Sequence, residues 1–174
     1  MVKEFNLKYF KRLSLTSKEK AFDYALDRLK WIGGSTRDVF EFNSKYVLKL
    51  DMECKQNCHE IMVSESYDMR DHIFTRVIDY DKHNYFWLIA EKAKPLKSYK
   101  QFKELAGISI NDIVAIEYNH SNKNKLLKKS SLLKKVYYLN NKFNVADLCC
   151  KENWGIFNGK PIIIDYGYYE ENIS

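Results

Sequence analysis

The sequence predicts an α+β fold in which an antiparallel sheet comes first and a mostly helical half follows. Two observations favour it. The first ninety residues carry short apolar segments separated by turns, and from Pro95 to Phe143 the apolar residues recur at helical spacing. With 174 residues, of which 45% are hydrophobic, the chain holds enough apolar material for one core or two small lobes.

Two helical patterns occur in the first half. Thr16 and Glu19 form a capping-box pattern that predicts a helix over about residues 17–30, and the segment before them stays unassigned. A second helix is expected over about residues 55–70, with Glu60 on one of its faces. The first of these helices precedes the first strands in the chain, and the second follows them.

Turn residues divide the rest of this half into short strands. The motif Gly33-Gly34-Ser35-Thr36 predicts a tight turn after the extended Trp31-Ile32. Strands are expected over residues 38–42, 46–50, 74–80 and 85–91. Together these segments predict a five-stranded antiparallel sheet, with the 55–70 helix packed on it.

The second half is helical until its last segment. Ser109 and Asp112 are placed to cap one helix, and another is expected over residues 131–143. Three glycines, Gly155, Gly159 and Gly167, then punctuate a short hairpin that ends in an apolar strand. The expected domains are an N-terminal extension (1–30), a sheet lobe (31–94) and a reduced helical lobe (95–174).

Composition restricts the classes of ligand and compartment. The net charge of +6 suits a polyanion such as nucleotide phosphate or nucleic acid, although solubility alone also accounts for it. A zinc site is disfavoured because two of the four cysteines, Cys149 and Cys150, are adjacent and chelate poorly. No apolar leader or membrane-length run occurs, so a cytoplasmic protein with reduced thiols and no membrane partner is expected.

Polar residues in a particular chain order indicate phosphoryl transfer. Backbone amides of a glycine turn can cap phosphates, a lysine can neutralise them, and a glutamate can hold that lysine. An asparagine oxygen and a carboxylate can ligate Mg²⁺. The residues that fit this order after the glycine turn are Lys49, Glu60, Asp147, Asn153 and Asp165.

In these residues the sequence resembles the protein kinase-like fold, and most of all the small kinase-like proteins of bacteria and their phages. The resemblance covers about residues 31–168. Its strongest part runs from Asn153-Trp154-Gly155 to Asp165-Tyr166-Gly167. The other matching motifs are Gly34-Ser35-Thr36-Arg37-Asp38-Val39-Phe40, Tyr46-Val47-Leu48-Lys49, Gln56-Asn57-Cys58-His59-Glu60 and Leu88-Ile89-Ala90-Glu91-Lys92-Ala93.

The resemblance implies a site for ATP and Mg²⁺. The residues it implies for the nucleotide are Gly33, Gly34, Ser35, Thr36, Lys49, Glu91 and Ala93. Those implied for catalysis are Asp147, Lys49 and Glu60, and those implied for the metal are Asn153 and Asp165. Other roles for these residues stay open. Lys49 could be an exposed lysine on a strand, and Glu65 could be its partner in place of Glu60. Ser35, Thr36, Asn153 and Asp165 could simply be turn residues.

Two departures from the family pattern concern the second lobe. Asp147 lies six residues before Asn153 instead of five, and Val145-Ala146 replace the usual histidine and arginine. A bulge could absorb the extra residue, or the carboxylate could swing away from the site. The chain ends seven residues after Gly167, which leaves a truncated lobe.

Two functions therefore remain in view. The first is an ATP- and Mg²⁺-dependent phosphotransferase of the Ser/Thr kinase-like type. The alternative is a pseudokinase that acts as a protein-interaction module, for example a phage protein that binds a host factor. A protein partner or a second copy of the chain could cover apolar surface on the truncated lobe. The lysine run 123–135 is expected to be a solvated helix face, so nucleic acid is a disfavoured partner.

Overall fold

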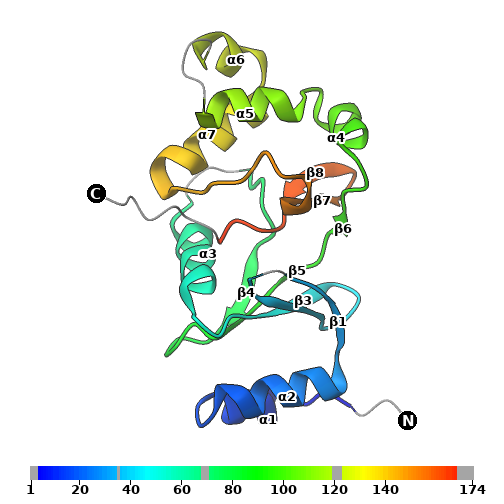
Figure 1. The fold of residues 1–174 in the computed structure, drawn as a ribbon, viewed down its shortest axis with the longest axis vertical. Coiled ribbons are helices and arrows are strands. Elements are labelled where there is room, and N and C mark those ends of the chain that lie inside the picture. Colours follow the sequence, from blue (N-terminus) through cyan, green and yellow to red (C-terminus); the bar gives the residue numbers. More distant parts are fainter. Residues whose placement is uncertain (1–3, 35, 68–70, 119–122, 168–174) are drawn as a thin grey trace. The chain divides into compact units, whose positions relative to one another are not determined.

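The computed structural model describes residues 4–34, 36–67, 71–118 and 123–167 (Figure 1). The chain forms two compact units. The first contains the described residues up to Ser64 together with residues 76–92. The second contains the described parts of 65–75 and of the chain from Ala93 onward.

An antiparallel sheet of five strands is the centre of the first unit, as predicted. Its strands are β1 (Lys30–Gly33), β2 (Asp38–Glu41), β3 (Tyr46–Leu50), β4 (Val77–Tyr80) and β5 (Trp87–Glu91). They lie in the spatial order β1-β2-β3-β5-β4. β3 therefore pairs with β2 on one side and β5 on the other, which makes it the central strand.

Two helices that precede the sheet pack on one of its faces, α1 (Leu7–Ser14) and α2 (Lys18–Arg28) (Figure 1). Their shared core with the sheet consists of Phe10, Ala21, Ala25, Phe40, Leu48, Leu50, Phe86, Trp87 and Ile89. α1 lies in the opening segment that the sequence left unassigned. Its N-cap is Asn6, whose side chain accepts a hydrogen bond from the backbone N–H of Tyr9.

The cap of α2 corrects a sequence prediction by one residue. Ser17, not Thr16, is the N-cap, and its hydroxyl accepts a hydrogen bond from the backbone N–H of Lys20. The Thr16 hydroxyl instead donates to the carbonyl of Leu13 at the end of α1. Both residues can cap a helix, and the local turn after α1 decides which one does.

Helix α3 (Lys55–Ser66) covers the other face of the sheet. Its Ile61 packs with Val47, Leu88 and Ala90, whereas Leu48 and Leu50 belong to the core with α1 and α2. Because side chains alternate along a strand, Lys49 is on the same face as Val47, toward α3. α3 ends at Ser66, short of the predicted residue 70, and residues 68–70 lie outside the described part of the chain.

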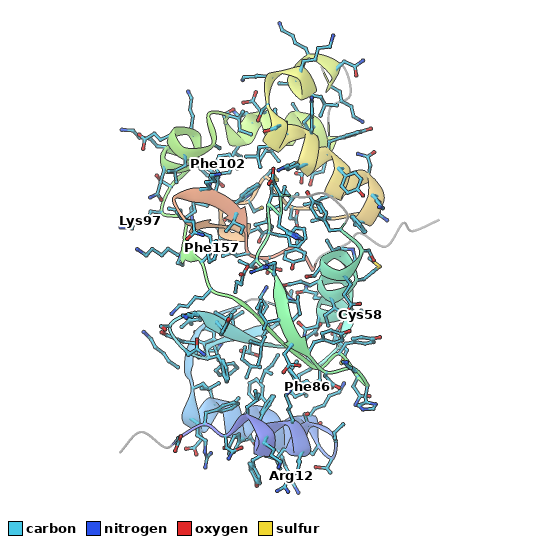
Figure 2. The ribbon with its side chains drawn as sticks, turned by 180° about the vertical axis from the view of Figure 1, so that it is seen from behind. Arg12, Cys58, Phe86, Lys97, Phe102 and Phe157 are labelled. Atoms are coloured by element: carbon cyan, nitrogen blue, oxygen red, sulfur yellow. The ribbon has the colours of Figure 1, made fainter. Side chains whose placement is uncertain are left out.

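In its described residues, the second unit contains four α-helices, a 3-10 helix (Lys151–Asn153) and a small sheet. The helices are α4 (Tyr99–Ala106), α5 (Ile110–Tyr118), α6 (Lys123–Lys129) and α7 (Ser131–Phe143). The antiparallel strands are β6 (Lys94–Pro95), β7 (Trp154–Phe157) and β8 (Lys160–Ile163). Phe102 of α4 packs edge-on against Trp154 with ring centroids 4.9 Å apart; Figure 2 labels Phe102 on its helix.

One helix cap of this unit is confirmed and one strand is corrected. The Ser109 hydroxyl accepts from the N–H of Asp112, and the Asp112 carboxylate accepts from the N–H of Ser109, which is the predicted capping pair. The strand expected from residue 74 begins only at Val77. Phe74 instead forms a parallel bridge with Ile163, because the segment before β4 pairs with the end of β8 in the second unit.

All four cysteines are free thiols. Cys58 on α3 is exposed (Figure 2), and Cys54, Cys149 and Cys150 are half-buried. Across the described ranges, none of the helices combines the length and the apolar content that crossing a bilayer requires.

Candidate functional site

The glycine turn between β1 and β2 has a backbone that requires glycine. Gly33 and Gly34 have φ angles of 143° and 130°. A Cβ atom on Gly34 would lie 1.8 Å from the carbonyl oxygen of Arg37, so any side chain there would collide with the loop itself. Ser35 lies outside the described residues. The Thr36 hydroxyl donates to Oε1 of Gln56 at 3.0 Å, which ties the turn to α3.

Lys49 and Glu60 form a buried ion pair. Lys49 Nζ lies 2.7 Å from Glu60 Oε1 and 2.9 Å from Oε2. The two side chains are 5% and 0% exposed, so the pair is largely shielded from water and from screening by salt. Glu65, the rival carboxylate, is exposed on α3. The strand-lysine and helix-glutamate arrangement expected from the sequence is therefore formed by Glu60.

A second cation, Arg37, shares the same carboxylate, and the sequence did not assign it a role. Arg37 is 4% exposed, and its guanidinium donates to Glu60 Oε2 and, at 3.0 Å, to Asn57 Oδ1. Asn57 is fully buried and donates to the carbonyl of Phe86 at 2.9 Å. The position of Arg37 two residues before Val39 was an available signal, since the kinase loop pattern has a glycine there.

Glu91 and Ala93, which the resemblance assigns to nucleotide binding, differ from each other in their contacts. The Glu91 carboxylate accepts from the Arg76 guanidinium at 2.7 Å and from the Arg76 backbone N–H at 3.1 Å. Ala93 belongs to the second unit, where it packs against β7. A Cβ atom on Gly155 would lie 2.9 Å from both Ala93 Cβ and the Lys94 carbonyl oxygen, so this packing requires glycine.

The two predicted metal ligands are joined through the backbone. The Asn153 carbonyl accepts from the N–H of Ile164 at 2.8 Å and from that of Asp165 at 3.4 Å. Asn153 Nδ2 donates to the carbonyl of Asp147 at 2.8 Å. A carbonyl can only accept, so this bond fixes which side of the amide faces Asp147 and turns Oδ1 away from it. An amide oxygen and the Asp165 carboxylate are the oxygen donors that Mg²⁺ prefers.

The loop from Asp147 to Asn153 contains the residue that exceeds the kinase spacing. Asp147 has a φ of 58°, in the left-handed region that aspartate tolerates better than most residues. Its carbonyl also accepts from the N–H of Cys150 at 3.0 Å, which closes a turn. The side-chain bond from Asn153 to the same carbonyl spans this turn.

Glu117 of α5 also binds this loop, and the sequence analysis did not identify this contact. Its Oε1 accepts from the N–H of Leu148 at 2.9 Å, and the Leu148 carbonyl accepts from Trp154 Nε1 at 2.7 Å. Burial raises the pKa of Glu117, and the nearby charge of Asp147 acts in the same direction. Burial and the charge of Glu117 raise the pKa of the Cys149 thiol to about 12.

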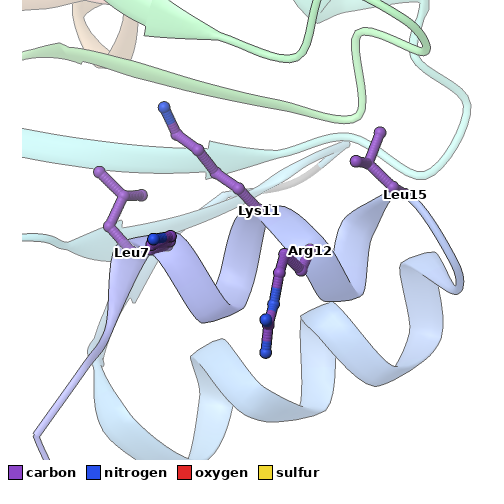
Figure 3. A pocket seen from close by; sticks show the side chains of 5 residues that line it. Leu7, Lys11, Arg12 and Leu15 are labelled. Carbon is purple, nitrogen blue, oxygen red and sulfur yellow. The ribbon is translucent and has the colours of Figure 1, made fainter.

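Other features of the described residues lie apart from these groups. A shallow depression on α1 is lined by Leu7, Lys8, Lys11, Arg12 and Leu15, and none of the predicted site residues lines it (Figure 3). No three His, Cys, Asp or Glu residues gather as metal ligands within the part of the chain that the structure describes.

No protein-family model and no curated protein sequence matches the chain. Among solved structures, it is similar to the streptomycin–ATP ternary complex of APH(2")-IIa, with 15% identity and a TM-score of 0.41, covering 95% of this chain and 72% of that one. It is also similar to ADP-bound aminoglycoside phosphotransferase APH(2'')-Ib, with 15% identity, a TM-score of 0.41, and 94% and 71% covered. For a thermostable mutant of aminoglycoside phosphotransferase APH(4)-Ia, the identity is 12%, the TM-score 0.38, and the coverage 80% and 66%.

The class of the protein follows from its own topology. A glycine turn joins two antiparallel strands, the third strand carries a lysine, and the helix after it carries the paired glutamate. A mostly helical unit with an asparagine and an aspartate joined across a hairpin comes later in the chain. This is the element order that the resemblance to the protein kinase-like fold leads one to expect, and the α+β architecture predicted from the sequence, an antiparallel sheet followed by a mostly helical half, is confirmed.

Proposed function

We propose that this chain binds ATP with Mg²⁺ and transfers the γ-phosphoryl group to a hydroxyl acceptor, in the manner of Ser/Thr kinase-like phosphotransferases. The observation that carries the proposal is the buried Lys49–Glu60 pair. A buried ion pair costs desolvation energy and is often no more stable than apolar side chains would be. A lysine held in this way is suited to a task that needs a fixed positive charge.

Under this proposal, the first unit binds the nucleotide. Lys49, oriented by Glu60, neutralises the α- and β-phosphates, and the glycine turn at Gly33 and Gly34 presents backbone N–H groups to the phosphates. The segment from Glu91 to Ala93 offers its backbone to the adenine. The side chain of Glu91, engaged by Arg76, has the separate task of fixing the end of β5.

Asn153 and Asp165 would hold Mg²⁺. Their fit to this ion rests on the chemistry of the donors: two hard oxygen ligands, one of them an amide oriented by its bond to Asp147. When bound, Mg²⁺ would supply positive charge that neutralises phosphate oxygens. The backbone N–H groups of Ile164 and Asp165 donate to the Asn153 carbonyl, and these bonds keep the two ligands in register.

Asp147 would accept the proton of the attacking hydroxyl. Three bonds fix the loop that carries it: Asn153 and Cys150 donate to the Asp147 carbonyl, and the Leu148 N–H donates to the Glu117 carboxylate. The extra residue in the same loop favours the second candidate function, a pseudokinase that binds partners without turnover. A displacement of about 1 Å at a catalytic group can cost about 10²-fold in rate, so the two functions differ by a small movement of one carboxylate.

Nucleotide-dependent thermal stabilisation tests the binding part of the proposal. ATP at about 100 times its Kd should stabilise the wild type by about 2.7 kcal/mol. Lys49→Met should lose most of this shift with or without magnesium, and Asp165→Asn should lose only the part that depends on magnesium. Lys45→Met, an exposed lysine in the turn before β3, makes the same charge change and should behave as the wild type. No shift with any purine nucleotide would refute the proposal.

A further inference from the structure

Arg37 and Lys49 meet on a single carboxylate oxygen. Lys49 Nζ lies 2.9 Å from Glu60 Oε2, and the Arg37 guanidinium donates to that same oxygen. The two cations therefore lie no further apart than two hydrogen-bond lengths. Arg37 and Lys49 are each 4% exposed as whole residues, so these neighbouring cations are largely removed from water.

The chain holds Arg37 in this place from two sides. The turn at Gly34 brings the backbone close to Arg37, because a Cβ atom on Gly34 would lie 1.8 Å from the Arg37 carbonyl oxygen. On α3, Asn57 and Glu60 accept from the two terminal nitrogens of the guanidinium. Thr36, one residue earlier, adds its bond to Gln56. A long, rotamer-rich side chain is thus fixed in one orientation before any ligand arrives.

We propose that Arg37 is a second phosphate-binding residue, which acts with Lys49 as a two-cation clamp on the polyphosphate of a nucleoside di- or triphosphate. The inference rests on the proposed function, which gives the β1–β2 loop and Lys49 to the phosphates. Two buried like charges that share one carboxylate repel each other, and a further anion beside them relieves that repulsion. Guanidinium is also the side-chain group best shaped for paired hydrogen bonds to phosphate oxygens.

The position of Arg37 in the loop explains why a side chain is used. The glycine-rich kinase loop places a glycine two residues before the valine, and its bare backbone approaches the phosphates. Here an arginine occupies the position two residues before Val39. Its charged side chain would therefore contribute part of the phosphate binding that backbone N–H groups provide in the glycine-rich loop. A purely structural Arg37 would only pin the loop to α3, and it would not distinguish among ligands by their phosphates.

Binding of ATP, ADP, AMP and adenosine to Arg37→Gln, measured by titration calorimetry, separates the two roles. The clamp predicts that Arg37→Gln weakens ATP and ADP by about 10- to 100-fold, weakens AMP less, and leaves adenosine unchanged. Arg37→Lys, which keeps the charge but not the fork, should recover part of the loss. Arg12→Gln, an exposed arginine on α1, makes the same change in charge and should match the wild type (Figure 2).

Three results would overturn the inference: equal weakening of adenosine and ATP, unchanged affinity for all four ligands, or tighter binding of ATP. If Arg37→Gln does not fold, Arg37→Lys decides, since the clamp requires it to lose more affinity for ATP than for adenosine. If the wild type binds ATP and Arg37→Gln binds it equally well, the clamp is refuted and the proposed function is not. A wild type that binds none of the four refutes the proposed function and the clamp with it.

Discussion

Asn153 donates its side-chain N–H to the backbone carbonyl of Asp147 at 2.8 Å, so the residue proposed to hold metal also fixes the residue proposed to act as base. The same carbonyl accepts from the N–H of Cys150. The bond crosses the turn that contains the one residue in excess of the kinase spacing. A change at Asn153 should therefore affect the loop as well as the metal.

Asn153→Asp tests this double role. The substitution replaces the donating Nδ2 by a carboxylate oxygen that faces a carbonyl, so stability should fall by about 1–3 kcal/mol even without nucleotide. Urea unfolding of the free protein would measure it. Asn111→Asp makes the same chemical change at an exposed position near the start of α5, where a negative charge is favourable, and should cost nothing. Equal stability of both variants would contradict a structural role for the Asn153 amide.

Glu60→Gln should be more destabilising than Lys49→Met. Glu60 is the common partner of two buried cations, and its neutralisation leaves both without their carboxylate, at a cost of about 3–5 kcal/mol. In Lys49→Met, Glu60 keeps its bonds to Arg37, and the methionine fills the apolar space. The urea midpoints of the two variants give the comparison. The reverse order would mean that Arg37 contributes nothing to holding Glu60.

Glu117 predicts a specific dependence of stability on pH. Its pKa is raised above the ordinary 4.5 mainly by burial, so the folded state binds the proton more tightly than the unfolded state does. The stabilisation from this group is complete below pH 4.5 and is lost as the pH rises through the raised pKa. Glu117→Gln removes that loss. The stability of the variant relative to the wild type should therefore increase from pH 4.5 upward, and a constant difference in urea unfolding across that range would contradict the prediction.

Cys149 should react slowly with alkylating reagents. Burial and the neighbouring charge of Glu117 raise its pKa to about 12, so very little thiolate exists at neutral pH. Iodoacetamide labelling followed by peptide mass spectrometry should show the exposed Cys58 modified well before Cys149. Glu117→Gln should speed the labelling of Cys149, because it removes the charge that opposes the thiolate. Equal rates at Cys58 and Cys149 in the wild type would contradict the prediction.

Much of the architecture could be predicted from the sequence because its signals are local. The five-stranded sheet and the Ser109–Asp112 cap depend on alternation, turn residues and short-range hydrogen bonds. α1 was left unassigned although Leu7, Phe10 and Leu13 recur at helical spacing, because a segment of eight residues is too short for that spacing to distinguish a helix from other structure. Phe74 was assigned to a strand of the first sheet because nothing local reveals its pairing with Ile163, about ninety residues later.

Part of the candidate site could likewise be predicted from the sequence, and part of it depends on tertiary contacts. Lys49 and Glu60 were predicted from their order in the chain, and the structure pairs them. Arg37 was missed because a charged residue in a glycine turn normally faces water, and only the packing of that turn on α3 buries it. Glu117 was missed because it accepts from a backbone N–H 31 residues further along the chain. Contacts of that kind depend on how α5 packs, which composition and spacing do not report.

The most direct test of the proposed phosphotransfer is turnover of ATP by the wild type and by Asp147→Asn. ADP formation, with and without hydroxyl acceptors, should be measurable for the wild type in the presence of magnesium. It should fall by about 10²- to 10⁴-fold in Asp147→Asn, because general-base catalysis contributes that much, while the affinity for ATP stays nearly unchanged. Glu104→Gln, an exposed carboxylate on α4, should turn over as the wild type does. A wild type that binds ATP and magnesium but forms no ADP, with Asp147→Asn indistinguishable from it, would contradict the account and favour the pseudokinase.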